Sequence, residues 1–327
     1  MRFAWPALLV GGAVFAAACS DQNPTQPNAP SSSLQSSPQT HIMLTRGLAL
    51  AAANQSKQAG GHGGGGGTGI FYHGGPLILN TKVVAIYWAA STIYAGGPTP
   101  GTTGTGAQDG SLVGFFLSNL GGSPYFNINT TYFDGSGNHV VNSVAYTGFW
   151  AANTNVPASG SSVSDAAVQA QVISGFTSGN LTFDPNTLYE VFSGPGVNLG
   201  GGFGTQYCAY HGHFSWNGND VKYSVMPHDY DFPTACAALN GSPNNDFAAD
   251  AEVNTLAHET EETTTDEDLN AWYDRRGNEN ADKCAWNFGS TFTTSNGATA
   301  NIQVGSKNFL VQQNWINSGS GGCRQGL

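Results

Sequence analysis

The chain has 327 residues, of which only 9% are charged, and its formal net charge is −11 at pH 7. An acidic balance of this size argues against nucleic acids and anionic membrane faces as partners, because both repel a negatively charged surface. With few charges and 45 glycines, the surface must rely on Ser, Thr, Asn and Gly, as is common in exported proteins with long loops.

The first 18 residues predict an export signal. Arg2 lies near the start, an apolar run follows at 7–15, and the segment ends in Ala-Ala-Ala-Cys at 16–19. Cleavage before Cys19 would leave this cysteine to be lipidated, as in bacterial lipoproteins; a plain secretory signal is the alternative. The apolar run is too short to span a membrane stably. We therefore expect an extracytoplasmic protein, either secreted or held at a bacterial cell envelope through lipid on Cys19 alone.

Residues 19–69 predict a disordered linker. Asn, Gln, Ser and Pro dominate 20–40, and a glycine run with one histidine occupies 60–67. A short apolar patch at 43–53 could form one helix that docks on the body as a pro-segment or tether. From there the composition becomes globular, and residues 70–327 are long enough to form a single domain with its own core.

The pattern of apolar residues beyond residue 70 alternates between strand-like and helix-like segments. In chain order it predicts a strand at 77–88, a helix at 111–120, a hairpin turn at 132–137 leading to a strand at 140–146, a helix beginning at Ser164, and strands at 188–192 and 221–226. This order is typical of an α+β fold, in which helices pack on a mixed β-sheet and long Gly/Thr/Asn-rich loops join them. It also matches the zincin-like arrangement of zinc peptidases, although a fold alone assigns no function.

Four cysteines remain once Cys19 is set aside: Cys208, Cys236, Cys284 and Cys323. An even number in an exported chain predicts two disulfides. Three pairings are possible, and order along the chain favours Cys208–Cys236 and Cys284–Cys323. Zinc ligation by these cysteines is the weaker interpretation, because no Cys-x-x-Cys pair is present.

Twelve of the 21 acidic residues lie between residues 246 and 282. This segment contains the motif His-Glu-Thr-Glu-Glu at 258–262, preceded by a polar cap at Asp246 and by apolar residues at helical spacing. On a helix, residues four apart leave the same face one turn apart, so His258 and Glu262 would be neighbours. We expect this helix to bury one side and to present His258 and Glu262 to a cleft or to water.

The motif has the geometry of His-Glu-x-x-His zinc peptidases, in which the outer residues hold the metal and the inner Glu handles the attacking water. His258 and Glu262 would then ligate zinc, with a carboxylate in place of the second imidazole. Glu259 would act as the general base. The third ligand would come from the acidic loop that follows the helix: Asp266, Asp268 or Asp274.

Two other interpretations of this segment remain open. Its carboxylates continue through Glu279 and Asp282, and oxygen-rich loops of this kind bind calcium. Acidic runs are also commonly solvated surfaces without a metal. In either case the protein would be a non-catalytic module for wall polymers or glycans. Aromatic residues that could make such contacts, although core is their default role, are Trp272, Tyr273, Trp286 and Trp315.

Histidines outside the motif are further candidates. His211 and His213 alternate, so that on a strand they would share a face, near the metal. A structural role is nevertheless the more common one for such histidines. His228 and Asp229, just before the acidic segment, are the best further ligand candidates outside it.

Residues 71–77, Phe-Tyr-His-Gly-Gly-Pro-Leu, and the apolar run at 83–88 resemble the EXORDIUM-like, or phosphate-induced, protein family. Cys-Ala-Tyr-His-Gly at 208–212, with Cys236 beyond it and a Gly/Asp/Asn-rich region closing on Cys323, extends the resemblance over residues 70–323. Members of this family are exported proteins of the cell wall or extracellular space, associated in plants with growth control. The resemblance implies an exported cell-surface protein that meets an extracellular polymer or peptide. The motif at 258–262 departs from the plant members and looks like a feature of a microbial branch.

Overall fold

The structure is a computed structural model that describes residues 1–2, 39–59, 69–237 and 239–327. The predicted signal, the predicted lipidation of Cys19 and the first part of the predicted linker fall on residues outside these ranges. Ser32–Leu327 forms one compact unit, and all elements described below belong to it.

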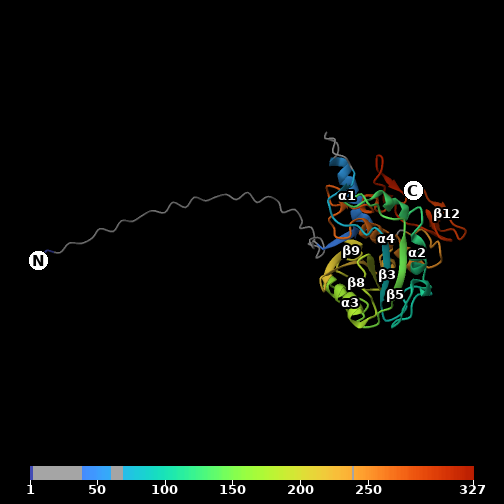
Figure 1. The fold of residues 1–327 in the computed structure, drawn as a ribbon, viewed down its shortest axis with the longest axis horizontal. Helices are drawn as coiled ribbons and strands as arrows, with labels where there is room; N and C mark the ends of the chain where they lie inside the picture. Colours follow the sequence, from blue (N-terminus) through green and yellow to red (C-terminus); the bar gives the residue numbers. More distant parts are fainter. Residues whose placement is uncertain (3–38, 60–68, 238) are drawn as a thin grey trace. The chain divides into compact units, whose positions relative to one another are not determined.

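A seven-stranded mixed sheet runs through this unit (Figure 1). In spatial order its strands are β1 (Thr40–Leu44), β9 (Tyr207–Trp216), β10 (Asn219–Met226), β7 (Thr187–Ser193), β3 (Thr81–Trp88), β5 (Val144–Trp150) and β4 (Thr103–Gly104). Strands β10, β7, β3 and β5 are parallel to one another. Strand β9 is antiparallel to both β10 and β1, and β4 is antiparallel to β5. The predicted α+β class with a mixed sheet is confirmed.

The helices of the body begin at the polar residues that the sequence marks as caps. Ser111 Oγ accepts from Gly114 N at the start of α2 (Leu112–Leu120), and Ser164 Oγ accepts from Ala167 N at the start of α3 (Asp165–Ser178). Asp246 caps α4 (Phe247–Thr265) in the same way. Each cap satisfies a backbone N–H that has no partner within its helix.

Helices α3 and α4 lie on opposite faces of the sheet. Tyr210 and His211 are neighbours on β9, so their side chains point to opposite faces. The Tyr210 hydroxyl donates to Asp165 Oδ1 on α3 at 2.8 Å, whereas His211 Nε2 lies 3.6 Å from Glu262 Oε2 on α4. Alternate side chains of β9 therefore point at the acidic motif.

Short strand pairs and 3-10 helices complete the unit. The pairs are β2 (Phe71–Tyr72) with β11 (Trp272–Tyr273), β6 (Ser162–Val163) with β8 (Asn198–Leu199), β12 (Phe292–Thr293) with β13 (Thr299–Ala300), β14 (Ile302–Val304) with β15 (Lys307–Phe309), and β16 (Asn314–Trp315) with β17 (Cys323–Arg324). The 3-10 helices are η1 (Gly106–Gln108), η2 (Phe126–Thr131), η3 (Asp229–Asp231) and η4 (Asp282–Cys284).

Both predicted disulfides are confirmed. Cys208–Cys236 joins β9 to the segment before α4, with its Cα atoms 5.3 Å apart. Cys284–Cys323 joins η4 to β17, with its Cα atoms 5.6 Å apart. The second bridge fixes the loop after α4 to the C-terminal end of the chain.

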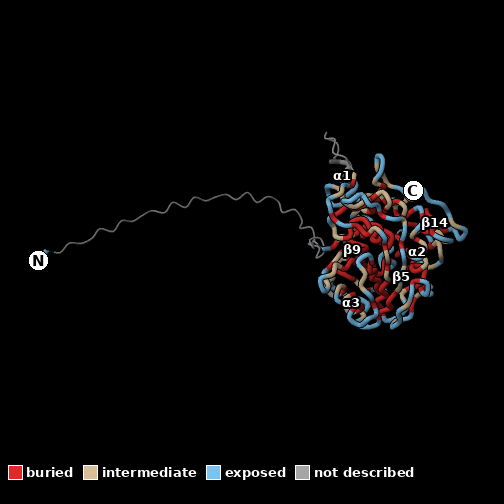
Figure 2. Tube along the Cα trace, in the orientation of Figure 1, coloured by how far each residue is buried: buried red, intermediate tan, exposed pale blue. Residues whose placement is uncertain are grey.

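Helix α4 lies in the interior of the unit (Figure 2). Every residue from Ala249 to Thr265 is buried, so the expectation of a helix with one exposed side is wrong. The C-terminal segment covers the side away from the sheet: Gln312 N donates to Asn254 Oδ1 at 2.8 Å, and Asn314 Nδ2 donates to Glu261 Oε2 at 2.6 Å. The interpretation of the motif as a solvated acidic surface is contradicted as well.

Two further segments differ from the sequence-based expectation. The turn at 132–137 closes only an isolated bridge between Phe133 and His139, and β5 pairs in parallel with β3 instead of forming a hairpin. Part of the expected disordered linker forms strand β1, which was not predicted, and helix α1 (Arg46–Ala59), which overlaps the helix expected within 43–53. Strand β1 gains its order from pairing with β9, a partner that lies far away in the sequence.

Candidate metal centre

Helix α4 places His258 and Glu262 one turn apart, as four-residue spacing requires. His258 Nε2 lies 3.1 Å from Glu262 Oε1, and neither side chain is exposed. Glu259 projects from the same turn, and both of its carboxylate oxygens are buried without a hydrogen-bond partner among the described residues. The three motif side chains therefore lie together, in a closed interior rather than in a cleft.

Asp282 joins them from the loop after α4. Its backbone N donates to Glu262 Oε1 at 2.8 Å, and its Oδ1 lies 3.6 Å from His258 Nε2. The disulfide at Cys284, two residues later, holds this loop in place.

The sheet contributes His211 from β9. Its Nε2 lies 3.6 Å from Glu262 Oε2 and 3.5 Å from Glu279 Oε2. His211 is completely buried, and neither of its ring nitrogens has a hydrogen-bond partner in the described part of the chain. An imidazole in this condition is suited to a ligand that the protein itself does not supply.

A third imidazole comes from β1, where His41 lies opposite His211 in the strand register. His41 Nε2 lies 2.6 Å from Asp282 Oδ2, and its Nδ1 lies 3.6 Å from Glu279 Oε1. Seven side chains from four separate segments thus converge. We call them the central cluster: His41, His211, His258, Glu259, Glu262, Glu279 and Asp282.

The spacing of these donors fits a metal ion. In a tetrahedral zinc site with bonds of about 2.0–2.1 Å, two ligand atoms lie about 3.3 Å apart. The distances from His258 Nε2 to Glu262 and Asp282 are 3.1 and 3.6 Å. Glu262 belongs to three overlapping groups of possible ligands: with His258 and Asp282, with His211 and Glu259, and with His41 and Glu279. The cluster can therefore accommodate one ion, or two ions that share Glu262.

Burial and mutual attraction set the protonation of the cluster. Burial works to lower the pKa of His258, but the carboxylates of Glu262 and Asp282 outweigh it and raise that pKa. Burial likewise works to raise the pKa of Glu262, yet the imidazoles of His258, His211 and His41 hold it below its usual value. Burial raises the pKa of Glu259 and Glu279 well above the ordinary range. Without a cation, the cluster must hold protons to limit its negative charge.

Gln312 fixes the other ring nitrogen of His258. The side-chain amide nitrogen of Gln312 lies 2.6 Å from His258 Nδ1 and donates to Ala281 O at 3.1 Å. Trp286 N donates to Gln312 Oε1 at 3.2 Å, which fixes the orientation of the amide. His258 Nε2 faces Glu262 and Asp282.

The three aspartates predicted as third ligands occupy three different places. Asp266 lies at the end of α4, where its Oδ1 accepts the N–H groups of Asn270 and Ala271 at 2.6 and 2.5 Å, and its Oδ2 is buried without a hydrogen-bond partner within the described ranges. Asp274 closes a turn by accepting from Arg276 N and Asn278 N. Neither residue belongs to the donor groups around Glu262.

Asp268 belongs to a second, half-exposed group with His213 and Asp220. His213 Nδ1 lies 2.8 Å from Asp220 Oδ1 and 3.8 Å from Asp268 Oδ1, and Lys222 Nζ lies 2.9 Å from Asp220 Oδ2. His213 does share the α4-facing side of β9 with His211, as the alternation predicts. A lysine partner compensates part of the negative charge here, in contrast to the central cluster.

His228 and Asp229 lie near the N-terminal half of α4, away from the motif. His228 Nδ1 lies 3.1 Å from Asp231 Oδ1, and Thr255 Oγ1 donates to Asp229 Oδ2 at 2.5 Å. Burial, followed by the charge of Glu252, raises the pKa of Asp229 well above its ordinary value. Among the donor groups that could hold a metal, Asp229 occurs only beside the two disulfide-bonded cysteines Cys208 and Cys236.

No local pattern in the sequence marks His41 as part of the site, because it lies before residue 70, where the composition becomes globular. His211 is only one of several candidate histidines in the sequence. Glu279 and Asp282 are visible only as members of an oxygen-rich run. Register could have found the first two, because His41 and His211 become neighbours once β1 and β9 are paired. Gln312 carries no recognisable signal at all.

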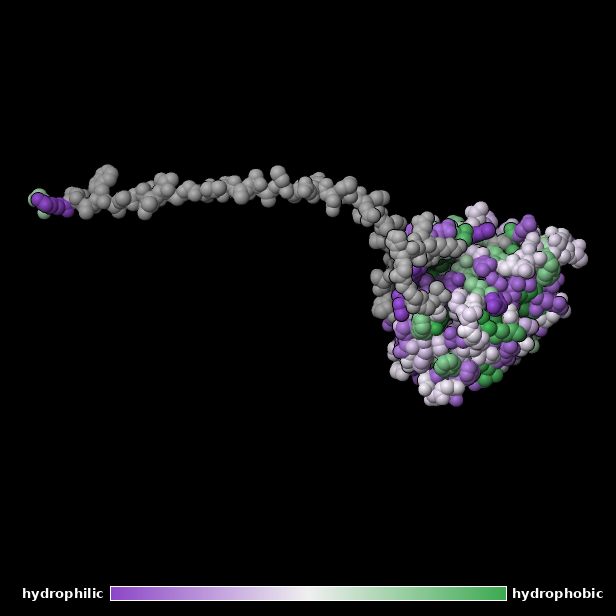
Figure 3. All heavy atoms as spheres, turned by 90° about the horizontal axis from the view of Figure 1, so that it is seen from above, coloured by the Kyte–Doolittle hydropathy of each residue, from purple (hydrophilic) through white to green (hydrophobic). Residues whose placement is uncertain are grey.

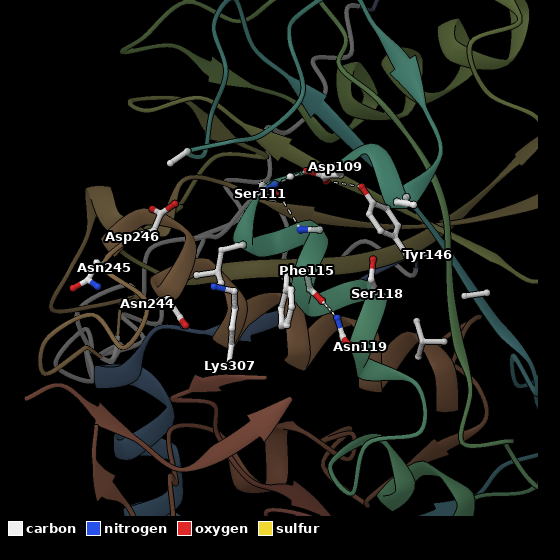
Figure 4. Close-up of a pocket in the computed structure, with 18 residues that line it drawn as sticks. Asp109, Ser111, Phe115, Ser118, Asn119, Tyr146, Asn244, Asn245, Asp246 and Lys307 are labelled. Carbon is white, nitrogen blue, oxygen red and sulfur yellow. Dashed lines mark hydrogen bonds between the residues drawn. The ribbon is translucent and has the colours of Figure 1, made fainter. Parts of the chain in front are cut away.

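A surface cavity, drawn in Figure 4, is lined by residues outside the central cluster. It has a volume of about 760 Å³ and lies between α2, β5 and the loop before α4. Asp109 accepts hydrogen bonds from the hydroxyls of Tyr87 and Tyr146 at its wall, and Lys307 lies over the ring of Phe115. No residue of the central cluster lines this cavity.

The aromatic residues proposed for glycan contact are largely occupied by the protein itself. Trp272 and Trp286 are buried in the core. Tyr273 stacks on His73 with ring centroids 3.7 Å apart, and Lys283 lies over Trp315. On the face that Figure 3 presents, hydrophobic residues form scattered spots among polar ones.

Comparison with known proteins gives no relative for this chain. No protein-family model, no curated protein and no solved structure matches it. Within the described residues, no helix has both the length and the apolar character needed to cross a membrane. The central cluster is therefore the main guide to function.

Proposed function

We propose that this chain is an exported, metal-dependent hydrolase that cleaves peptide bonds, and that the central cluster binds its metal. One observation carries the proposal: seven ionisable side chains from β1, β9, α4 and the loop at η4 meet in the interior, with several of their donor atoms unsatisfied. Buried charges persist in proteins when they are paired or coordinate a metal. Here the carboxylates outnumber the imidazoles, and a bound cation would compensate their negative charge.

Zinc fits this donor set better than calcium does. Calcium takes oxygen ligands almost exclusively, whereas each group around Glu262 contains an imidazole, a ligand that zinc accepts together with carboxylates. His258, Glu262 and Asp282 form the group with the shortest contacts and would hold the ion. A bound zinc ion would supply Lewis acidity to a substrate carbonyl and to a nearby water molecule.

Glu259 is the proton carrier of the proposed reaction. Burial raises its pKa well above the ordinary value, so it holds a proton far more tightly than a surface glutamate. To take a proton from an attacking water, Glu259 must first be ionised, which a cation bound at Glu262 would favour; it could then give that proton to the leaving amine. His211, beside Glu262 and Glu279, would bind either a second ion or the developing oxyanion.

The export of the protein is part of the proposal. Two disulfides stabilise the unit, and such bonds persist mainly outside the cytoplasm. The signal predicted at 1–18, lipid anchoring through Cys19 and the resemblance to the EXORDIUM-like family point to the same compartment. The substrate would accordingly be an extracellular peptide or protein.

Elemental analysis of the purified protein tests the metal site. We expect about one to two zinc ions per chain, in keeping with the overlapping ligand groups. Glu262→Gln should lower the zinc content to background, whereas His73→Ala, which changes an exposed histidine outside the cluster, should leave it unchanged. Protein that contains no metal and folds equally well with or without zinc would refute the proposal.

Peptide cleavage tests the catalytic role. Glu259→Gln keeps the shape of the side chain but cannot carry the proton, so it should retain zinc and lose at least about 100-fold of the cleavage rate. Equal rates for the variant and the parent would exclude Glu259 as the proton carrier.

A structural metal site is the second candidate, and the closure of the cluster favours it. Structural zinc sites are enclosed by protein ligands, whereas catalytic sites keep an open position. In that case zinc would raise the melting temperature without any peptide cleavage. Glu259→Gln would then change stability alone.

A further inference from the structure

Strand β1 lies at one edge of the main sheet, although it is far in the sequence from its neighbour β9. Residues 40–44 come from the N-terminal side of the glycine run at 60–67, yet they pair antiparallel with β9, which is otherwise the terminal strand of the sheet. The pairing continues at both ends: His213 N donates to Gln39 O at 3.2 Å, and Thr45 N donates to Gln206 O at 3.1 Å. An extended segment added to a sheet edge through main-chain hydrogen bonds is a recurring mode of peptide binding.

Few side chains anchor β1. Met43 is completely buried and Thr40 nearly so, while helix α1, which follows directly, is largely exposed, with Leu48 and Leu50 over 40% accessible. Beyond Arg46, whose backbone N donates to Ala235 O at 3.0 Å, this helix packs only lightly on the body. The segment thus resembles a bound peptide, with a paired backbone and one buried apolar side chain.

His41 lies between solvent and the rest of the central cluster. Its side chain is 24% exposed and that of Asp282 is 12% exposed, whereas the side chains of His211, His258, Glu262 and Glu279 are at most 2% exposed. Access to the cluster from solvent therefore lies on the His41 side. A substrate that reaches Glu259 and Glu262 must displace β1 or take its place.

We infer that the edge of β9 is the binding site for an extended peptide, and that residues 40–44 of the same chain fill it in the described state, with His41 at the cluster. The inference deepens the proposed function by naming the substrate class, and it takes its catalytic meaning from that function. A peptide in the place of β1 pairs with Gln206, His211 and His213 through its backbone. Its residue at the position of His41 faces the cluster, and its residue at the position of Met43 enters the core.

This arrangement predicts a preference in the peptide. Residues two apart on a strand share a face, so His41 and Met43 both point toward α4. The site should accept an apolar side chain two positions after the residue that meets the cluster. The N-terminal segment would hold the enzyme latent until the connection between it and the body is cut.

The test opens that connection after folding. The glycine run at 60–67 is replaced with the recognition sequence of a specific protease, the full chain is purified and folded, and it is then cut. A fluorescent peptide with the sequence of residues 38–46 is added to the cut and uncut proteins, and binding is followed by anisotropy. We expect micromolar binding to the cut protein, after exchange with its own segment, and at least tenfold weaker binding to the uncut protein.

Matched peptides show whether the contacts are those of β1. A peptide with His41→Ala should lose contact with the cluster, one with Met43→Asp should lose the apolar anchor, and one with Thr45→Pro should lose the N–H that Gln206 accepts. Each change should weaken binding at least tenfold. A scrambled peptide of the same composition should not bind.

Zinc content, measured on the same samples, separates this inference from the proposed function. Peptide binding in a protein without metal would retain the edge site and refute the metal centre. Zinc bound in a protein whose cut segment neither leaves nor exchanges with peptide would refute the inference alone.

Uncut His41→Ala protein gives a second measurement. If His41 covers the cluster, a chelator should remove zinc from this variant at least tenfold faster than from the parent. Equal rates would overturn the inference.

Discussion

Gln312 illustrates how a single distant residue can control the cluster. Its amide nitrogen lies 2.6 Å from His258 Nδ1 and 3.1 Å from Ala281 O, and its backbone N donates to Asn254 on α4. It thereby ties His258, the loop that carries Asp282 and the middle of α4 to one another. A partner of this kind orients a metal-ligating imidazole and typically contributes 10–100-fold to metal affinity.

We predict that Gln312→Ala lowers zinc affinity about 10- to 100-fold. The reason is that His258 loses the contact that fixes its ring, while all proposed ligands remain. Competition with a chromophoric chelator measures the change. Gln303→Ala, which removes an exposed glutamine bonded only to Gly305 O, is the control, and equal affinities for the two variants would contradict the role of Gln312.

Glu190 is a further buried carboxyl beneath α4 with a raised pKa. Burial raises the pKa of this carboxyl on β7 to about 8. Its Oε1 lies 2.7 Å from Thr260 Oγ1, which itself lies 2.7 Å from Leu256 O. A hydroxyl has only one hydrogen, so a protonated Glu190 that donates to Thr260 lets Thr260 donate to Leu256.

This raised pKa fixes the sign of a pH effect on stability. The native state binds the Glu190 proton more tightly than the unfolded state does. The stabilisation that this proton contributes to the native state is therefore complete below pH 4.5. It is lost as the pH rises toward 8, by about 1.4 kcal/mol per pH unit. We predict that Glu190→Gln gains up to about 3 kcal/mol relative to the parent between pH 5 and pH 8. Denaturant unfolding at both pH values measures it.

The control for this prediction is Asp134→Asn. Asp134 is an exposed carboxyl whose pKa is lowered through its hydrogen bonds with Asn138. It is ionised in the native and unfolded states between pH 5 and pH 8, so its removal should leave the pH dependence of stability in this range unchanged. A constant difference between Glu190→Gln and the parent across this pH range would show that Glu190 is ionised in the native state.

The position of the segment around η4 depends on the disulfide Cys284–Cys323. Cys284–Cys323 closes 39 residues next to Asp282, whereas Cys208–Cys236 closes 28 residues near Asp229. By loop-closure entropy, loss of either bridge should cost about 2–4 kcal/mol of stability. Only the first bridge lies beside one of the three residues proposed to hold the zinc ion, His258, Glu262 and Asp282.

We therefore predict that the double variant Cys284→Ser with Cys323→Ser loses both stability and zinc affinity. The double variant Cys208→Ser with Cys236→Ser should lose a similar amount of stability but keep its zinc affinity. Thermal unfolding and zinc titration of the two variants test this pair of expectations. Equal zinc affinities would mean that the bridge does not position Asp282.

The sequence predicts the elements better than their burial. The cap at Asp246 and the helix through the motif follow from local spacing, which depends only on neighbouring residues. Both disulfides follow from the number of cysteines and their order along the chain. The burial of α4 depends on the sheet beneath it and on Gln312 and Asn314, which lie 58 and 53 positions after their partners Asn254 and Glu261. No periodicity within the helix itself shows such cover.

The same limit applies to the central cluster. The spacing of His258 and Glu262 is local, and the sequence predicts their contact. The contributions of His41 and His211 depend on the register of two strands that lie about 170 positions apart. Asp268 and Asp274 follow the motif closely in the sequence, but the loop places both of them outside the donor groups around Glu262.

If the central cluster binds the proposed ion, folding and ion binding are coupled. The donors exist as a site only when the sheet, α4 and the η4 loop are in place, so binding free energy adds to the free energy of unfolding. We predict that a strong chelator lowers the melting temperature and that zinc, but not calcium, restores it. At zinc 100-fold above its dissociation constant, the expected stabilisation is about 2.7 kcal/mol. A melting temperature unaffected by both treatments would leave the cluster without a metal.

The enclosure of α4 also bears on when and where the ion is acquired. Since His211, His258, Glu262 and Glu279 have almost no solvent contact, the proposed ion would load slowly after folding unless β1 lifts, and faster during folding. If the chain crosses the membrane unfolded and forms its disulfides outside, the envelope, not the cytoplasm, supplies the metal. The identity of the ion would then follow the metals present there, because availability as well as affinity decides what a nascent site captures.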